Sequence, residues 1–164
     1  MSCSKQRGEP ATRHATLFLT IDESTYSRSR SMVLNVGIRN DGRNPIYVYK
    51  EIAWGYGGGL VLEIKDRAGV DVIPVLWDDT MLPPPRRLDD PAIFVQLGED
   101  NFFGTHRVLP LKDITESTGK YTMRVEYNSP LSCASVDPKL QRLPALWHED
   151  ASIFSNTVSF EIRP

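Results

Sequence analysis

Apolar and polar residues alternate with a period of two in several short segments of the chain, which are residues 15–22, 32–39, 60–65, 121–127 and 156–162. This period places successive side chains on opposite faces of an extended strand. No apolar period of 3.6 residues continues for more than about ten residues, so no long amphipathic helix is expected. The alternation predicts sheets with one buried face and one face in water.

Turn sequences separate these segments and extend the prediction. The chain has 11 glycines and 12 prolines, and turns are expected at 40–45, 66–69 and 98–101. Further strands are predicted at residues 46–49, 70–75, 92–97 and 102–111, and a helical turn is predicted within 111–118. We therefore predict an all-β fold, an antiparallel β-sandwich of about eight strands with a long loop before the last strand. Residues 1–14 are predicted to form a flexible tail, and residues 15–164 a single domain.

The stretch EIAWGYGGGLVLEI, residues 51–64, places four glycines within five positions. A phosphate-binding loop of the GxxxxGK[ST] type would need a lysine and a hydroxyl residue at the start of a helix, and neither is present. The dinucleotide motif GxGxxG fails because Leu60 stands at its last glycine. We interpret the stretch as a hinge that turns the chain between two strands, because glycine accepts positive φ angles.

Two aromatic residues of this hinge, Trp54 and Tyr56, are candidates for a binding surface. Aromatic side chains with a polar tip suit stacking on a sugar ring or contact with a partner protein. This role requires exposed rings. The alternative is that they belong to the core.

The strand at residues 121–127 follows a turn that ends at Gly119, and Tyr121 opens it. In immunoglobulin-like sandwiches a tyrosine at this corner bonds back to the preceding backbone, so we expect Tyr121 and Gly119 to have structural roles. Met123 stands where antibody domains carry cysteine, which makes the chain similar to disulfide-free sandwiches of the fibronectin III kind. The segments LNVGIRNDGRNPIYV, GGGLVLEIKDRAG, GKYTMRVEY and SNTVSFEI resemble bacterial sandwich domains, whose plan the Bacillus intracellular proteinase inhibitors share. The resemblance implies an immunoglobulin-like sandwich. No inhibitory residue of the proteinase inhibitors can be matched to a position of this chain.

Residues 128–154 form a connection that is long for a compact domain. Its apolar residues include Leu140 and Trp147, whose spacing with Leu143 and Leu146 fits one face of a short helix. Either these residues close one end of the core, or they contribute to a binding surface. The immunoglobulin-like resemblance implies that this connection and the turns at 40–45 and 98–101 share one end. We expect recognition there.

The net charge of the chain and the spacing of its reactive residues disfavour several functions. The chain has 19 basic and 21 acidic residues, so its net charge of −2 gives no general attraction to nucleic acid or anionic membrane. No apolar run is long enough for a transmembrane helix. The three histidines are scattered, and the carboxylates at 78–79 and 89–90 lack a calcium-loop spacing. We expect no catalytic residue, no metal site and no cofactor.

The chain has two cysteines, Cys3 and Cys133, which do not make a disulfide framework. We do not expect them to bridge, and no neighbouring base activates Cys133. Cys3 and the polar residues that follow it resemble the acylated cysteine and polar tether of a bacterial lipoprotein. A signal sequence before Cys3 would place the protein in the periplasm or at the cell surface with a lipid anchor. Without one we expect a cytoplasmic protein.

These observations predict a non-enzymatic interaction or accessory module. We expect it to bind a protein through loops at one end, and we keep a glycan as an alternative ligand. The second hypothesis is a proteinase inhibitor, which would present an ordered loop to a protease cleft.

Overall fold

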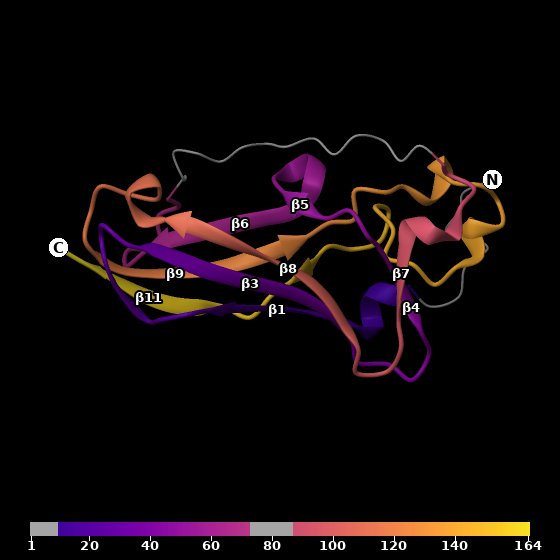
Figure 1. The fold of residues 1–164 in the computed structure, drawn as a ribbon, viewed down its shortest axis with the longest axis horizontal. Helices are drawn as coiled ribbons and strands as arrows, with labels where there is room; N and C mark the ends of the chain where they lie inside the picture. The colour runs from indigo at the N-terminus through magenta and orange to yellow at the C-terminus, as the bar shows by residue number, and fades with distance from the viewer. Residues whose placement is uncertain (1–9, 73–86) are drawn as a thin grey trace.

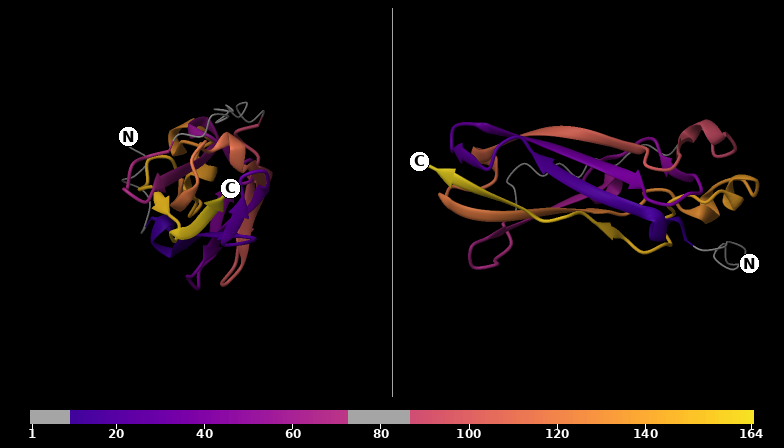
Figure 2. Two further views of the ribbon diagram at one scale, coloured as in Figure 1. Left: turned by 90° about the vertical axis from the view of Figure 1, so that its left-hand side faces the viewer. Right: turned by 90° about the horizontal axis from the view of Figure 1, so that it is seen from below.

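The computed structural model describes residues 10–72 and 87–164, apart from the side chain of Tyr56. The fold is all-β, and two sheets face each other in an elongated sandwich (Figure 1; Figure 2). The first sheet has the order β1 (Ala15–Ile21), β3 (Ser31–Asn40) and β8 (Phe102–Pro110). The second has the order β2 (Thr25–Ser27), β11 (Val158–Arg163), β9 (Gly119–Tyr127), β6 (Gly59–Asp66) and β5 (Ala53–Trp54), and β10 (Ile153–Phe154) also pairs with β9. A separate pair, β4 (Ile46–Tyr49) and β7 (Phe94–Leu97), stands at one end of the sandwich.

Six short 3-10 helices occur in the described residues, and none is long and apolar enough to span a membrane. They are η2 (Ala11–His14), η3 (Tyr56–Gly58), η4 (Pro91–Ile93), η5 (Leu111–Asp113), η6 (Cys133–Ser135) and η7 (Leu140–Arg142). The helical turn predicted within residues 111–118 is confirmed by η5. The helix-like spacing in the long connection yields only η7, because Pro144 cannot continue a helix.

Alternation decides which side chains enter the core. Every second residue of β3 and β9 is buried between the sheets, as the sequence predicts: Met32, Leu34, Val36, Ile38, Tyr121, Met123, Val125 and Tyr127. The central strands β3 and β9 each pair with neighbours on both sides. Burial of these apolar faces is the main favourable term for a fold of this kind.

Three elements differ from the prediction. The strands β2, β5 and β10 are missing from it, because two or three residues are too few for a visible alternation. In the strand expected at 70–75, only Asp71 pairs, through an isolated bridge to Lys65, and residues 73–75 lie outside the described part. The expected tail ends earlier, because Ala11 is buried in the core and the His14 carbonyl accepts a hydrogen bond from the Asp41 amide. Residues 1–9 lie outside the described part.

The glycine stretch is a hinge, as predicted. Gly55 has φ 104° and Gly59 has φ 93°, and η3 lies between them. A side chain on Gly58 would lie 2.5 Å from the Ala53 carbonyl oxygen. The glycines thus allow β5 to turn directly into β6, its parallel neighbour.

Residues 128–154 build a second small core at the end that holds β4 and β7 (Figure 1). Its buried members are Tyr49, Ile93, Phe94, Leu131, Cys133, Val136, Leu140, Ala145 and Trp147. The connection docks along β4, where the Tyr47 amide donates to the Pro144 carbonyl and the Leu146 amide donates to the Tyr47 carbonyl. The apolar residues of the connection therefore close this end, one of the two roles expected from the sequence.

Asn40 joins the turns at this end. Its side chain is fully buried, and its Nδ2 donates to the carbonyls of Asn44 at 2.9 Å and Leu97 at 3.0 Å. Its Oδ1 accepts from the Gly42 amide, and its backbone exchanges hydrogen bonds with Asp100 and Asn101. One amide therefore fixes the turns at 40–45 and 98–101 against each other.

Replacing Asn40 tests this role. We expect Asn40→Ala to lower the free energy of unfolding by about 2 kcal/mol or more, because buried backbone groups lose their partners. Asn35→Ala on the exposed face of the same strand is the matched control and should change it by less than about 0.5 kcal/mol. Urea denaturation followed by circular dichroism measures both. Equal effects of the two variants would contradict the role of Asn40.

Candidate functional site

The structure places the predicted binding residues mainly inside the protein. Trp54 is only 8% exposed, and its ring faces the Arg107 guanidinium at 5.9 Å. Leu140 and Trp147 are buried in the second core, where Trp147 packs edge-on against Phe94 at 5.5 Å. The side chain of Tyr56 lies outside the described part. Trp54, Leu140 and Trp147 therefore offer almost no surface to a ligand, and their burial gives their predicted binding role no support.

Hydrogen bonds of Asn40 hold the end that carries the turns at 40–45 and 98–101. Residues of the long connection also bond among themselves. Glu149 accepts hydrogen bonds from the Ser132 hydroxyl and the Cys133 amide. Burial acts to raise the pKa of Glu149, but these hydrogen bonds outweigh burial and hold the pKa below its usual value. Recognition by the loops of this end stays a prediction.

The other reactive residues serve local structure. Cys133 is buried and disulfide-bonded, so the expectation of an unbridged thiol is wrong at this position; Cys3 lies outside the described part. The His148 Nδ1 lies 3.0 Å from the Ser129 carbonyl oxygen. Asp90 caps η4 through the Ala92 amide. Within residues 10–72 and 87–164, no group of three His, Cys, Asp or Glu side chains is placed to hold a metal ion.

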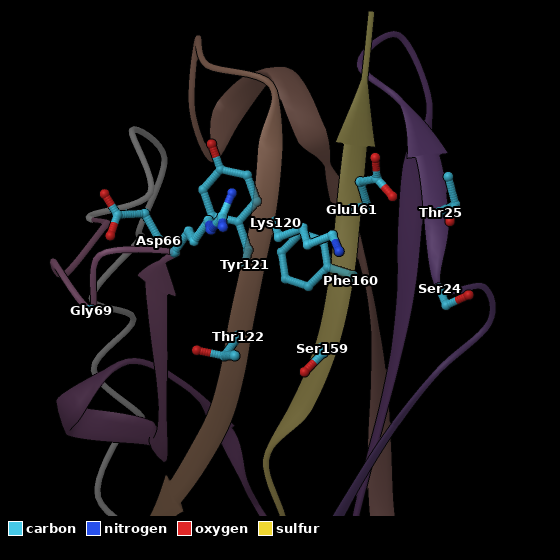
Figure 3. A pocket seen from close by; sticks show the side chains of 11 residues that line it. Ser24, Thr25, Asp66, Gly69, Lys120, Tyr121, Thr122, Ser159, Phe160 and Glu161 are labelled. Atoms are coloured by element: carbon cyan, nitrogen blue, oxygen red, sulfur yellow. The ribbon is translucent and has the colours of Figure 1, made fainter.

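A hollow of about 650 Å³ opens on the second sheet, at the end that holds the C-terminus (Figure 3). The turn from Asp66 to Gly69 bounds one side and Ser24 the other. Strands β2, β9 and β11 form the floor. No local pattern in the sequence predicts this hollow, because its residues come from four separate parts of the chain.

Strand register sets the pattern of side chains on this floor. Lys120 and Thr122 of β9 alternate with buried Tyr121, and Ser159 and Glu161 of β11 alternate with buried Phe160. Thr122 lies opposite Ser159, and Lys120 lies opposite Glu161. The outer face thus has a row of hydroxyls beside a pair of opposite charges.

The charges of the hollow are not equally available. Glu161 accepts two hydrogen bonds from Arg163 at 3.3 Å, and this partner holds the pKa of Glu161 below its usual value. Asp66 accepts from the amides of Ala68 and Val70 and thereby closes its own turn. Lys120 and Arg67 form no ion pair with residues of the described part. The two carboxylates of the lining therefore have hydrogen-bond partners, whereas the two cations have none among the described residues.

Stacked aromatic rings support the floor from the core side. Tyr121 stacks on Phe160 with ring centroids 5.5 Å apart, and the Tyr26 ring meets Phe160 edge-on at 6.5 Å. The Tyr121 hydroxyl donates to the Ser117 carbonyl at 2.9 Å. The expected bond of Tyr121 back to the preceding backbone is confirmed. Gly119 adopts φ 147° at the start of β9, which favours glycine there.

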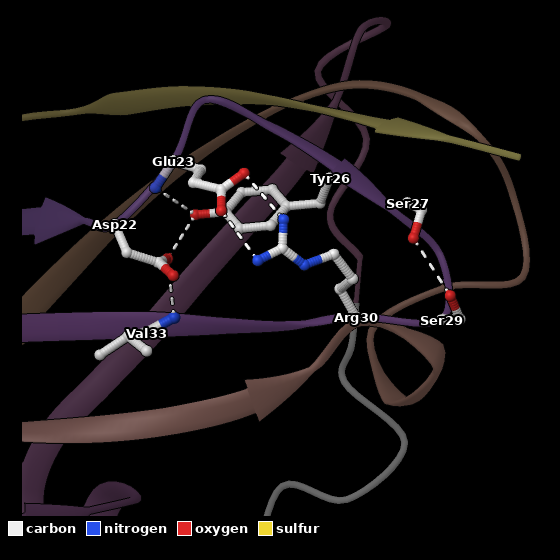
Figure 4. Close-up of polar contacts among 7 residues, drawn as sticks. All are labelled: Asp22, Glu23, Tyr26, Ser27, Ser29, Arg30 and Val33. Atoms are coloured by element: carbon white, nitrogen blue, oxygen red, sulfur yellow. Dashed lines mark hydrogen bonds and ion pairs between the residues drawn. The ribbon is translucent and has the colours of Figure 1, made fainter.

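Tyr26 is fixed in turn by a polar cluster between β1 and β3 (Figure 4). Its hydroxyl donates to Asp22 at 2.6 Å and accepts from the Glu23 amide at 2.9 Å. Asp22 also accepts from the Val33 amide, and Glu23 pairs with Arg30 at 2.8 Å. Burial acts to raise the pKa of Asp22, but the hydrogen bonds from Tyr26 and Val33 outweigh it and lower the pKa. Burial and the Asp22 carboxylate both raise the pKa of Tyr26.

No protein-family model and no curated protein matches the chain. Among solved structures, a β-glucosidase of Erythrobacter marinus matches with 9% identity over 91% of this chain and 15% of its own, with a TM-score of 0.41. The chain therefore spans a small part of that enzyme. AvmM, which catalyses macrocyclization in alchivemycin A biosynthesis, matches with 12% identity over 92% of this chain and 89% of its own, with a TM-score of 0.45. Both TM-scores are too low to support a functional argument.

The Asp22 cluster makes folding stability depend on pH. Because the pKa of Asp22 is lowered in the folded state, its contribution is complete above the unfolded pKa of about 4 and is lost as the pH falls through the folded value. We expect Asp22→Asn to lose less stability than the wild type between pH 5 and pH 2.5. Urea midpoints at several pH values measure this, with Asp113→Asn as the control. Parallel curves for the wild type and Asp22→Asn would exclude the linkage.

Proposed function

We propose that the chain is an immunoglobulin-like sandwich that acts as a non-enzymatic interaction module. We further propose that the hollow on the second sheet binds an acidic segment of a protein partner. The observation that carries the proposal is that two cations, Lys120 and Arg67, lie beside a row of hydroxyls in the hollow of about 650 Å³. Binding through the loops of the opposite end is the alternative location.

The chemistry of the lining favours a carboxylate ligand. Lysine and arginine donate charge-assisted hydrogen bonds to carboxylates, and hydroxyls can donate to further oxygens of the same segment. Glu161 opposes an anion only weakly, because Arg163 already neutralises it. Including Arg163, three positive side chains face two negative ones at this place.

A glycan fits the hollow less well than a peptide. Sugar rings are usually held by an exposed aromatic face, whereas the rings of Tyr121 and Phe160 are buried in the core. Ser24, Thr25, Thr122 and Ser159 supply polar contacts but no stacking surface. We therefore propose a protein partner rather than a glycan.

The placement of Tyr121 supports the immunoglobulin-like assignment. It stands third in β9, after the crossing from the first sheet to the second, and its hydroxyl bonds to a carbonyl four residues upstream. This is the arrangement of the tyrosine corner in immunoglobulin-like sandwiches. Met123 occupies the position two residues later, so the sandwich has no cysteine there.

A labelled peptide of alternating aspartate and serine tests the hollow, with an asparagine–serine peptide as the uncharged probe. We expect the acidic peptide to shift the amide resonances of Thr122 and Ser159. Lys120→Met combined with Arg67→Met should weaken binding roughly 2- to 30-fold, because each exposed ion pair contributes about 0.2–1 kcal/mol. Fluorescence anisotropy at low salt measures the affinity.

Lys139→Met combined with Arg142→Met removes two exposed cations from the opposite end and is the matched control. We expect this variant to bind like the wild type. If it loses the peptide while the hollow variant keeps it, recognition belongs to the loop end. If neither peptide shifts any resonance of the hollow, the proposed site is wrong.

The proteinase-inhibitor alternative has one specific observation in its favour. The hairpin after β6 projects from the sandwich (Figure 2), and Val70 near its tip is 60% exposed. Asp66 orders this turn through the amides of Ala68 and Val70, and Gly69 adopts φ 80°. An ordered, projecting loop with a small aliphatic side chain suits a protease with a small specificity pocket.

The inhibitor alternative predicts that near-equimolar protein lowers the activity of an elastase-like serine protease without being degraded. Val70→Asp should abolish this inhibition, because a carboxylate is costly to bury in an apolar pocket. Residual activity on a chromogenic substrate measures the effect across a panel of serine and cysteine proteases. An unaffected panel would eliminate this alternative.

A further inference from the structure

Strand β8 forms one edge of the first sheet. It extends over nine residues, and proline occurs only at its last position, Pro110. In the described part of the chain, β3 is the only strand that pairs with it. A long edge strand of this kind presents backbone groups that can pair with another strand.

Two hydrogen bonds determine which residues of β8 face this edge. The Asn40 amide donates to the Asn101 carbonyl before β8, and the Leu111 amide donates to the Arg30 carbonyl after it. In an antiparallel pair, bonded residues alternate with residues whose amide and carbonyl point the other way. The odd-numbered residues therefore bond to β3, and Phe102, Gly104, His106 and Val108 direct their backbone groups toward the edge.

Two of these four residues also expose large apolar side chains. Phe102 is 67% exposed and Val108 is 56% exposed, and both are among the few large apolar side chains that the described residues leave in solvent. Phe18 holds Phe102 in place with an edge-on contact at 5.8 Å. Phe18 itself lies over Gly37, where a side chain would collide with its ring.

We propose that β8 pairs with β8 of a second copy of this chain, in antiparallel register about a two-fold axis at Thr105. Phe102 and Val108 lie at equal distances along the strand from Thr105. In this register, Phe102 of one copy lies opposite Val108 of the other, and the large side chain of His106 lies opposite Gly104. The strand is thus self-complementary, as a two-fold interface requires. The edge-facing backbone groups of the two copies also meet in bonded pairs.

The opposite edge of the same sheet is blocked. The side chain of Asn156 accepts from the Leu19 amide at 2.9 Å and donates to the Leu19 carbonyl at 3.0 Å. These bonds occupy backbone groups of β1 that another strand would need. Among the described residues, this sheet thus has one open edge and one blocked edge, which allows a closed pair of chains rather than an extended array.

A cysteine at the two-fold axis tests the register. Thr105 is a non-bonded position, where facing Cα atoms of an antiparallel pair lie about 4.5 Å apart, within the range for a disulfide. We expect Thr105→Cys to form a covalent dimer on mild oxidation, seen by non-reducing electrophoresis. The controls are the wild type and Thr20→Cys on the blocked edge strand. Both should migrate at the mass of one chain.

The apolar contacts are tested by sedimentation velocity. We expect the wild type to dimerise with rising concentration, and Phe102→Lys combined with Val108→Lys to remain monomeric, because like charges would then meet at the edge. Val70→Lys, an equally exposed apolar residue outside β8, should dimerise like the wild type. Circular dichroism checks that each variant is folded.

The proposal is overturned if the wild type stays monomeric up to about 1 mM protein, because the dissociation constant of a dimer would then exceed that concentration. It is also overturned if Thr105→Cys links no more than Thr20→Cys does. Dimerisation that persists in the folded double-lysine variant would place the interface elsewhere. None of these results depends on the acidic peptide, because the hollow lies on the second sheet.

Discussion

Contact between the inward faces of β3 and β9 is the constraint on which the rest of the protein depends. In both strands every second side chain is apolar and buried, and these side chains belong to one core between the sheets. A shift of one residue in either strand would turn its apolar row toward water. This packing therefore sets the register of the neighbouring strands, and through them the positions of the hollow and of the open edge.

Hydrogen bonds from polar side chains hold the turns and strand edges whose positions apolar packing does not determine. Asn40 satisfies the backbone of two turns from a fully buried position, and Asn156 satisfies the edge of β1. Tyr26 and Tyr121 each place a ring in the core and a hydroxyl on a specific partner. Each group is costly to bury unless its hydrogen bonds form, so each specifies one local arrangement.

The two ends of the sandwich differ in what they offer to a partner. At the β4–β7 end, the long connection packs into a second core that buries Leu131, Leu140 and Trp147. At the C-terminal end, small hydroxyl residues leave a hollow between longer charged side chains. Tyr121 stacked on Phe160, with Tyr26 edge-on against Phe160, supports the floor of this hollow from the core side.

The sequence by itself determined the longer strands β3, β6, β9 and β11, because their period-two alternation is a local property that burial then enforces. It also determined the glycine hinge, which follows from backbone conformation at a few neighbouring residues, whereas the hydrogen bond of Tyr121 is what the resemblance to immunoglobulin-like sandwiches implies. Only the tertiary structure decided that Trp54, Leu140 and Trp147 are buried, because an aromatic or aliphatic residue in a loop carries no local sign of what packs on it. It alone brought Ser24, Arg67, Lys120 and Ser159 together and left β8 at an edge, since these depend on the order in which strands pair.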